Sequence, residues 1–263
     1  MEGQKCFAVV GGDARQAAAA RALARAGYSV GGPEMIAVAD YILLPLPLDA
    51  ARTPLAELLR AARPGTLALG GMLSVEAKAI AAEAGVELVD YFAREELTIR
   101  NAIPTAEGCI GILMKERSRT LWGSSILLTG FGPVGQALGV RLAALGAQVT
   151  AAARRPESRA WAEACGYEAV DIGKLEGKLA EFDVVVNTAP APVFGRERLR
   201  ELKLGCLCVD VASVQGIDLA AAEELGLPNI WARMLPGKLM PRTAGRIIRD
   251  TVYTIIKEQG VML

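Results

Sequence analysis

A glycine-rich turn between two apolar segments constrains the fold of this chain more than any other feature. Gly130, Gly132 and Gly135 form a G-x-G-x-x-G pattern directly after a short apolar run at 126–128. Behind the glycines, apolar residues recur every three or four positions, which predicts a helix, and 149–153 is expected to be the next strand. A strand, glycine turn, helix and strand in this order are typical of dinucleotide-binding domains.

The three glycines have different expected roles. One allows a tight turn, one lets the backbone approach a pyrophosphate, and one lets the helix pack closely on the sheet. The helix N-terminus adds unpaired N–H groups and a positive dipole end. A glycine-rich turn without a ligand is the alternative, but the complete context favours cofactor binding. The turn residues expected to contact the cofactor are Gly130, Phe131, Gly132, Pro133, Val134 and Gly135.

The end of the second strand indicates which dinucleotide binds. An NAD site usually has an acidic residue here for the ribose hydroxyls, whereas this chain has Ala153, Arg154 and Arg155. The missing carboxylate removes repulsion against a 2′-phosphate, and a guanidinium binds a phosphate through two hydrogen bonds. We therefore predict that these residues bind NADP. NAD stays possible, because the arginines are otherwise a solvated strand end or stack on adenine.

Composition excludes several kinds of site. The chain of 263 residues has 29 basic and 29 acidic side chains and no histidine. The balanced charge gives no reason to expect a nucleic-acid partner. Without histidine, Ser-His-Asp sites, Cys-His sites and histidine-ligated metals are excluded. The histidine-based hydride-transfer site of common 2-hydroxyacid dehydrogenases is excluded as well, and no metal is expected.

The cysteines and the apolar segments indicate a cytoplasmic protein. The five cysteines are scattered without metal-ligand spacing, and the N-terminus has no basic-then-apolar signal pattern. An odd number of cysteines without a signal is typical of a reducing cytosol. Residues 120–140 carry no charge, but their internal glycine and proline turn argues against a membrane span. No membrane association is therefore expected.

Strand and helix patterns alternate over the first third of the chain and again after the glycine turn. We therefore expect an α/β protein with two Rossmann-like, doubly wound parallel-sheet domains and a C-terminal helix that packs back on the first domain. The expected parts are an N-terminal substrate or catalytic domain (1–105), a connecting helix (106–120), an NADP-binding Rossmann domain (121–240) and the C-terminal helix (241–263).

Several local signals set the expected helix positions. Thr53 is expected to cap a helix that has Pro54 at its first position, and Thr105 is expected to cap the helix at 106–115. A short helix is predicted at 175–181 and a final helix at 243–258.

Polar residues at expected strand ends are candidates for the rest of the site. Ligands of open α/β sheets lie at the carboxyl ends of the strands. In the second domain, the candidates for the nicotinamide side are Asn187, Thr188, Ala189, Asp210 and Ala212, followed by Ser213. In the first domain, Asp13 and Arg15 follow the first strand. They are expected either to face a substrate in an interdomain cleft or to form an ordinary helix cap at Asp13.

Seven sequence blocks, taken in order, resemble the A subunits of dipicolinate synthase. They span nearly the whole chain, so their combination is more specific than the glycine turn alone. The blocks are VVGGDARQ (9–16), RNAIPTAEG (100–108), LLTGFGPVGQALG (127–139), TAAARR (150–155), VVVNTAP (184–190), VDVAS (209–213) and LPGKLMPRTAGRI (235–247). Residues 31–40 and 45–49 look shorter than the family pattern.

The resemblance implies an NADP-dependent oxidation that forms dipicolinate in sporulating bacteria. The substrate would be dihydrodipicolinate, derived from 4-hydroxytetrahydrodipicolinate, and the partner a flavoprotein-like B subunit in a homo- or hetero-oligomer. A dicarboxylate needs cationic and hydrogen-bonding partners. We expect catalytic roles for Arg100, Asn101, Thr105 and Lys238, and substrate contacts from Asp13, Arg15 and Ser213. For each of these residues alone, a purely structural role is an equally good interpretation.

The chemistry itself does not require histidine. Oxidation of a dihydropyridine ring removes a hydride and a proton, and the aromaticity of the product drives the reaction, so positioning matters more than a strong base. The alternative hypothesis is a non-catalytic, nucleotide-binding scaffold for the B subunit. A relative of shikimate dehydrogenase is disfavoured, because no Lys-Asp pair occurs where that family's catalytic pair is expected.

Overall fold

The computed structural model describes residues 4–260, which divide into two compact units. Unit 1 comprises Met1–Asn101 and Pro236–Leu263, and unit 2 comprises Ala102–Leu235. Each unit is built around its own parallel sheet.

Unit 1 has a five-stranded parallel sheet in the order β2-β1-β3-β4-β5, one of the two common orders of doubly wound folds. Its strands are β1 (Cys6–Val9), β2 (Ser29–Gly31), β3 (Tyr41–Leu43), β4 (Leu67–Gly70) and β5 (Glu87–Asp90). Its helices are α1 (Ala14–Arg25), α2 (Leu55–Arg60), α3 (Val75–Glu83) and α10 (Pro241–Glu258), with 3-10 turns η1 (Pro33–Met35) and η2 (Tyr91–Ala93).

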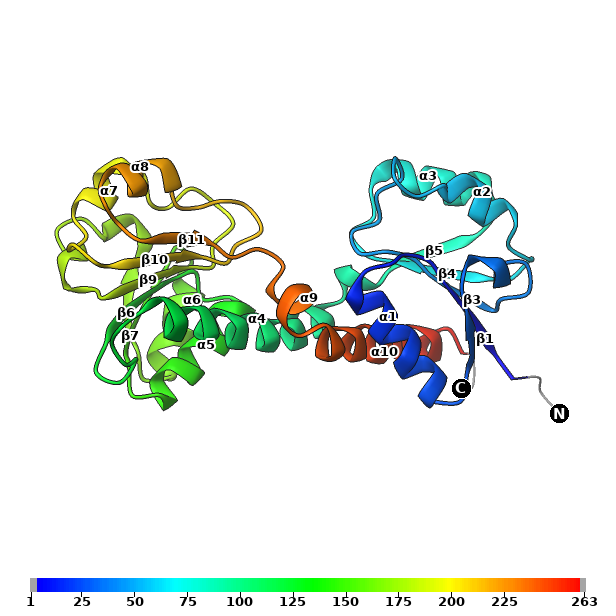
Figure 1. Ribbon diagram of the computed structural model, residues 1–263, viewed down its shortest axis with the longest axis horizontal. Helices are drawn as coiled ribbons and strands as arrows, with labels where there is room; N and C mark the ends of the chain where they lie inside the picture. Colours follow the sequence, from blue (N-terminus) through cyan, green and yellow to red (C-terminus); the bar gives the residue numbers. More distant parts are fainter. Residues whose placement is uncertain (1–3, 261–263) are drawn as a thin grey trace. The chain divides into compact units, whose positions relative to one another are not determined.

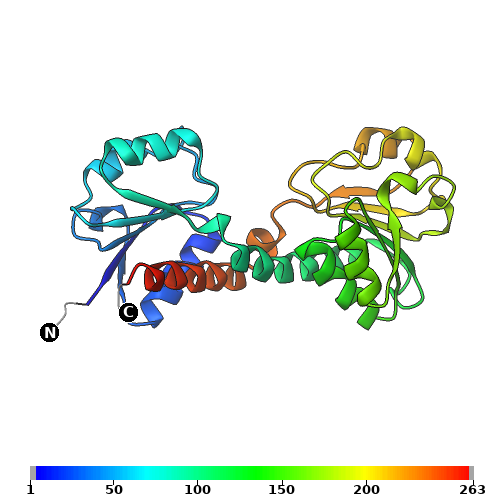
Figure 2. The same ribbon diagram turned by 180° about the vertical axis from the view of Figure 1, so that it is seen from behind.

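Alternate strand residues in unit 1 supply two apolar layers. Phe7 and Leu43 face α1 and α10, whereas Ala8 and Ile42 face α2 and α3. Figure 1 shows α2 and α3 over one face of this sheet and α1 with α10 over the other, and Figure 2 shows the same layers from behind. Because both faces are covered, the three central strands β1, β3 and β4 are apolar throughout and are recognisable in the sequence as continuous apolar runs. The edge strands β2 and β5 are less buried and include polar residues.

Unit 2 has a six-stranded parallel sheet in the order β11-β10-β9-β6-β7-β8. The strands are β6 (Ser125–Thr129), β7 (Gln148–Ala153), β8 (Glu168–Asp171), β9 (Val184–Asn187), β10 (Leu207–Asp210) and β11 (Asn229–Trp231). The order reverses between β6 and β9, as in the Rossmann fold. The crevice at the carboxyl ends of these two strands is the usual ligand site of such sheets.

Helices cover both faces of the unit 2 sheet. They are α5 (Pro133–Ala144), α6 (Pro156–Ala164), α7 (Arg196–Arg200) and α8 (Leu219–Glu224), with 3-10 turns η3 (Ile172–Lys174) and η4 (Leu179–Glu181). Helices α4 (Glu95–Glu116) and α9 (Leu235–Leu239) cross the boundary between the units. The predicted fold class, two Rossmann-like parallel-sheet domains with a C-terminal helix on the first, is confirmed.

The helix expected to start after Thr105 is longer than predicted. It begins at Glu95, so Thr105 lies inside α4 and is not its cap. Pro104 also lies inside the helix, where a proline typically costs about 3 kcal/mol. A buried stripe that includes Leu97, Ala106 and Leu113 compensates for this cost by packing along the helix.

Two other helix predictions were wrong in their details. Residues 175–181 do not form one helix, because Gly177 has a φ of +76° and only 3-10 turns lie around it. Helix α2 begins at Leu55 with Pro54 as its N-cap and no capping side chain, so Thr53 does not cap it. The short helices α7, α8 and α9 were not predicted, because five or six residues are too few to show a period.

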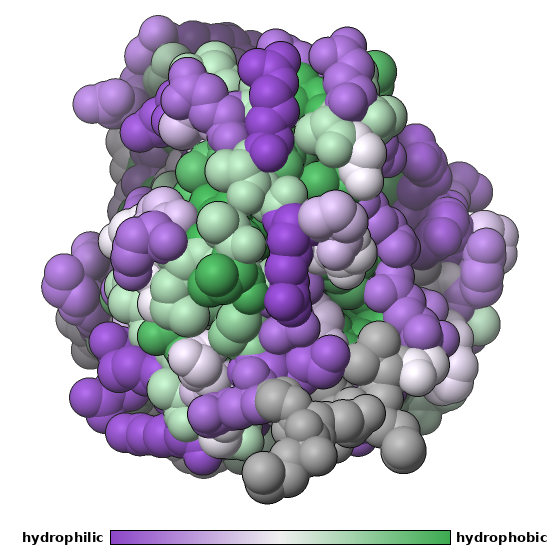
Figure 3. Space-filling model, turned by 90° about the vertical axis from the view of Figure 1, so that its right-hand side faces the viewer, coloured by the Kyte–Doolittle hydropathy of each residue, from purple (hydrophilic) through white to green (hydrophobic). Residues whose placement is uncertain are grey.

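Figure 3 shows one side of unit 1, on which apolar side chains gather in the middle and hydrophilic side chains surround and interrupt them. Single exposed apolar residues such as Val38 and Val75 are a normal feature of protein surfaces. Within residues 4–260, no helix is both long enough and apolar enough to cross a membrane.

A glycine at the crossing of α1 and α10 is expected to limit the stability of unit 1. A Cβ at Gly245 would lie 2.6 Å from Ala18 Cβ and 2.7 Å from both Ala19 N and Arg15 O. Because two of these atoms are backbone, Gly245→Ala should lower the free energy of unfolding by about 1–3 kcal/mol. Gly111→Ala, in α4, is the control: no atom lies within 4 Å of its Cβ position. Urea denaturation followed by circular dichroism measures both variants, and equal stabilities would contradict the expectation.

Candidate functional site

The glycine turn of unit 2 meets three separate geometric constraints. Gly130 has a φ of +90°, and its N–H donates to Ala152 O at 2.8 Å. Gly135 packs against the turn so closely that a Cβ would lie 2.2 Å from Gly130 O. Gly132, at the N-cap of α5, has open space around its Cβ position. The first and third glycines therefore shape the turn, and the second leaves the backbone open to a ligand.

Helix α5 presents its N-terminus at this turn. Pro133 occupies its first turn, and among the described residues no side chain caps the helix at Gly132. The first N–H groups of a helix have no partner within it and, with the helix dipole, attract anions.

The loop after β9 forms the opposite wall of the crevice. Thr188 N–H donates to Thr129 O at 2.7 Å, and Thr188 Oγ1 lies 3.0 Å from Thr129 O and 3.1 Å from Gly130 O. These bonds hold the start of the loop against the glycine turn, so the two walls are fixed relative to one another.

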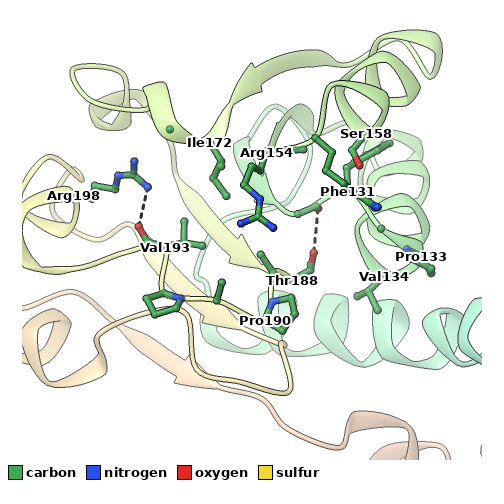
Figure 4. A pocket seen from close by; sticks show the side chains of 18 residues that line it. Phe131, Pro133, Val134, Arg154, Ser158, Ile172, Thr188, Pro190, Val193 and Arg198 are labelled. Carbon is green, nitrogen blue, oxygen red and sulfur yellow. Dashed lines mark hydrogen bonds between the residues drawn. The ribbon is translucent and has the colours of Figure 1, made fainter. Parts of the chain in front are cut away.

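A cavity of about 550 Å³ lies between these walls, a volume typical of cofactor sites. Its lining comes from the glycine turn, the end of β7, Ser158 of α6, the segment 172–173, the loop 188–193 and Arg198 of α7. Figure 4 shows the side chain of Arg154 extending into this cavity.

The arginines around the cavity have different partners. Among the described residues, the side chains of Arg154 and Arg155 have no hydrogen bond or ion pair. Arg198 is bound to Glu176 at 2.9 Å and donates to Val193 O at 3.0 Å. Arg159 Nη1 donates to Ala153 O and Arg154 O. Arg154 is therefore an uncompensated cation held at the cavity by an anchored strand end.

Asn187 lies at the end of β9 but is buried beneath the cavity rather than in its lining. Its Oδ1 accepts from Thr129 Oγ1 at 2.8 Å and from Ala189 N–H at 3.2 Å. Its Nδ2 donates to Ala189 O and to Asp210 Oδ1, both at 3.0 Å. The amide thus joins β6, β9 and β10 at their carboxyl ends.

Asp210 is also fully buried and engaged. Besides Asn187, it accepts from the backbone N–H groups of Ala212 at 3.0 Å, Gly216 at 2.6 Å and Ile217 at 3.0 Å. A buried carboxylate requires such donors, and here they fix the loop after β10. Ala212 is buried in this loop, and Ser213 is exposed next to it.

In unit 1, Asp13 is the N-cap of α1, accepting from Arg15 N–H at 2.7 Å and Gln16 N–H at 3.0 Å. Burial alone would raise the pKa of Asp13, but the hydrogen bonds from Arg15 and Gln16 outweigh this effect and lower it. Arg15 Nη2 donates to Asp13 at 2.8 Å and to Leu46 O at 2.6 Å. The cap predicted as the simpler interpretation of Asp13 is therefore present.

The remaining candidates lie on helices. Gly237 of α9 packs against the Arg15 side chain within unit 1, and Lys238 next to it is exposed. On α4, Arg100 is exposed, and Asn101 and Thr105 are half-buried and each interact with other groups. Within residues 4–260, no group of three or more acidic or cysteine side chains is placed to hold a metal ion.

Several cavity residues were not predicted. Ser158 stands in the first turn of α6 just after the two arginines, so the strand-then-helix rule that found Arg154 would also have found it. Ile172 and Gly173 follow β8, again at a carboxyl end. Arg198 gave no signal, because α7 itself was not recognised.

Residues 107–223 match the family model described as "D-isomer specific 2-hydroxyacid dehydrogenase, NAD binding domain". Together with the strand order and the cavity, this match gives the chain the fold and the nucleotide-binding domain of NAD(P)-dependent oxidoreductases. The predicted class of protein is confirmed at this level, and the cofactor is a nicotinamide dinucleotide.

Sequence and structure together point to a particular group of relatives, the A subunits of dipicolinate synthase. The chain is 32% identical over 180 residues to the A subunit of Bacillus subtilis, covering 68% of this chain and 61% of that protein's length. The crystal structure of the Bacillus halodurans A subunit has a TM-score of 0.85 at 27% identity, covering 97% of this chain and 99% of the other. The crystal structure of the Bacillus subtilis protein has a TM-score of 0.84 at 26% identity, with 98% and 97% covered. The chain is a relative of these proteins, and the resemblance seen in its sequence blocks is confirmed.

Two glycine variants should separate the folding and binding roles of the turn. Gly135→Ala places a Cβ against Gly130 O, a backbone atom, and is expected to destabilise unit 2 by about 2–4 kcal/mol. Gly132→Ala meets no atom within 4 Å and should fold normally, but its methyl group lies where a pyrophosphate approaches and should weaken dinucleotide binding about tenfold or more. Thermal unfolding and calorimetric titration measure the two effects. Normal dinucleotide affinity in Gly132→Ala would argue against a pyrophosphate at this turn.

Proposed function

We propose that this chain is the A subunit of a dipicolinate synthase and oxidises dihydrodipicolinate to dipicolinate with NADP. The observation that carries this proposal is the similarity to two solved structures of dipicolinate synthase A subunits, which extends over almost the whole chain and is combined with a complete nucleotide cavity. A nucleotide fold alone would support only an oxidoreductase of unknown substrate.

The preference for NADP rests on Arg154. Its guanidinium extends into the cavity without a partner among the described side chains, and no carboxylate lines the cavity to repel a phosphate. Ser158, in the first turn of α6, lines the same cavity and supplies a hydroxyl group. A guanidinium, a hydroxyl and a helix N-terminus form a favourable environment for a 2′-phosphate, with Arg155 at the N-cap of α6 as a further cation.

The glycine turn and the α5 N-terminus would hold the pyrophosphate, and the loop from Thr188 to Ala189 would lie along the nicotinamide ribose. A nicotinamide held in this way would supply the hydride acceptor. We infer that Asn187 and Asp210 act as positioning residues, because their polar groups are already engaged within the protein. Ala212 is part of the loop that Asp210 holds.

The proposed reaction takes a hydride and a proton from the dihydropyridine, giving dipicolinate, NADPH and a proton. The two carboxylates of the substrate call for cations and hydrogen-bond donors, for which we propose Arg15 and Ser213, with Asp13 orienting Arg15. Catalytic roles are proposed for Arg100, Asn101, Thr105 and Lys238. Their task would be to fix the ring, since aromatisation supplies the driving force.

We further propose that the partner is a flavoprotein-like B subunit and that the location is cytoplasmic, consistent with five free cysteines. A nucleotide-binding scaffold without hydride transfer is the competing function. The shorter segments at 31–40 and 45–49 are the feature that favours it.

A direct assay separates catalysis from a scaffold role. The purified chain, with NADP and freshly prepared dihydrodipicolinate, should produce absorbance in the reduced-nicotinamide band and dipicolinate in equal amounts. The assay is run with and without the B subunit, and heat-inactivated protein serves as the control. If the chain binds NADP but forms no NADPH in either case, the scaffold function is correct and the oxidoreductase proposal fails.

The cofactor preference is tested with one substitution. Arg154→Ala should raise the Kd for NADP by about tenfold to a hundredfold, because a charge-assisted bidentate contact is lost. The Kd for NAD should change little, since NAD has no 2′-phosphate. Arg200→Ala, an exposed arginine of α7 outside the cavity, is the matched control. Equal weakening of NADP and NAD would show that Arg154 does not bind the phosphate.

A further inference from the structure

A second concave site lies in unit 1, on the outer side of the helix pair α1 and α10. Its volume is about 410 Å³, and five of its eight lining residues are arginines. Arg21 and Arg25 come from α1, and Arg242, Arg246 and Arg249 come from α10; we call this site the arginine groove. Its other lining residues are Ala18, Ala22 and Thr243.

The positive charge of the groove is mostly uncompensated. Among the described residues, Arg21, Arg25, Arg242 and Arg246 make no ion pair. Arg249 lies 2.7 Å from Asp250 and 5.3 Å from the ring of Tyr253, so it is the one arginine of the five that has an ion pair within residues 4–260. Four guanidinium groups facing one groove repel one another, and an anion in the groove would relieve this repulsion.

The positions of these arginines along their helices are not those that helix stability favours. Arg242 lies in the first turn of α10, where the positive end of the helix dipole disfavours a cation. Arg21 and Arg25, like Arg242 and Arg246, are four residues apart on one helix, a spacing at which like charges are slightly destabilising. Only Arg25, in the last turn of α1, is well placed for its own helix. The arrangement is therefore better explained by a ligand than by folding.

The size and charge of the site favour a small ligand. Its volume lies within the range of small-molecule pockets. The whole chain has equal numbers of basic and acidic residues, so the groove is a local feature and not part of a broad basic surface suited to nucleic acid. Guanidinium groups bind carboxylates and phosphates in a planar, bidentate manner.

We propose that the arginine groove binds a small anion with two or more oxyanion groups, either carboxylates or phosphates. At least two groups are needed, because four uncompensated arginines line the groove and a single oxyanion accepts only one or two guanidinium forks. This inference does not rest on the proposed function, since the groove lies in unit 1 and the nucleotide cavity in unit 2.

Calorimetric titration of the full chain tests the groove with two probes, inorganic pyrophosphate and pyridine-2,6-dicarboxylate. At least one should bind, with an affinity that falls as salt increases, because the site is open to solvent. Arg242→Ala/Arg246→Ala should weaken that binding about tenfold or more. Arg52→Ala/Arg60→Ala is the control: it removes the same charge from the opposite side of the unit 1 sheet and should leave binding unchanged.

The outcomes are distinct. Tighter binding of pyrophosphate identifies a phosphorylated ligand, and tighter binding of the dicarboxylate identifies a ligand like the proposed product. NADP affinity should be unchanged in the groove variant, which separates this result from the nucleotide site. An unchanged circular dichroism spectrum and urea unfolding midpoint show that unit 1 of the variant is folded. The inference is overturned if neither probe binds, or if the groove variant and its control bind equally well. A changed oligomeric state in the groove variant, without binding of either probe, would instead indicate a protein interface.

Discussion

The close approach of two backbones at the carboxyl ends of β6 and β9 underlies the whole nucleotide site. A Cβ at Gly130 would lie 2.5 Å from Thr188 Oγ1 and 3.0 Å from Ala189 N, so only glycine allows the loop after β9 to touch the turn after β6. At this contact, the Thr188 hydroxyl lies within hydrogen-bond distance of the carbonyl oxygens of Thr129 and Gly130. The cavity walls are thus set by atoms that cannot move independently, and a ligand entering the cavity meets a preformed surface.

A network of buried polar side chains extends the link between β6 and β9 to the next strand of the sheet. Thr129, Asn187 and Asp210 stand at the ends of three neighbouring strands and are linked by two hydrogen bonds, and Asp210 gathers three backbone N–H groups beyond them. Leaving any of these groups without a partner would carry the full cost of desolvation. The three side chains therefore act as one hydrogen-bonded network. Polar residues beneath a ligand site can thus be essential to the shape of that site without contacting the ligand.

The sequence was most informative where a local pattern is compatible with only one local structure. Strands covered on both faces must be apolar throughout, and a glycine turn between strand and helix has few other uses, so the sheets, the turn and Arg154 were predictable. Asn187 and Asp210 show the limit, because a polar residue at a strand end looks the same whether it faces a ligand or a neighbouring strand. Pro104 misled in another way: a local helix breaker was outweighed by the packing of α4, which no local pattern contains.

Unit 1 illustrates why sites formed by distant segments escape sequence analysis. Arg21 and Arg242 lie far apart in the chain and meet only because Gly245 lets α10 approach α1 to within contact of Ala18. The same helix pair also carries Arg15, which is held by Asp13 and Leu46 and packs on Gly237. Small residues on the inner faces of α1 and α10 therefore position two cationic groups: Arg15 at the start of α1, and the arginine groove along the outer side of the helix pair. The arginines supply the positive charge of the groove. The small residues between the two helices let the helices approach closely, and this approach brings the arginines of both helices to the same groove.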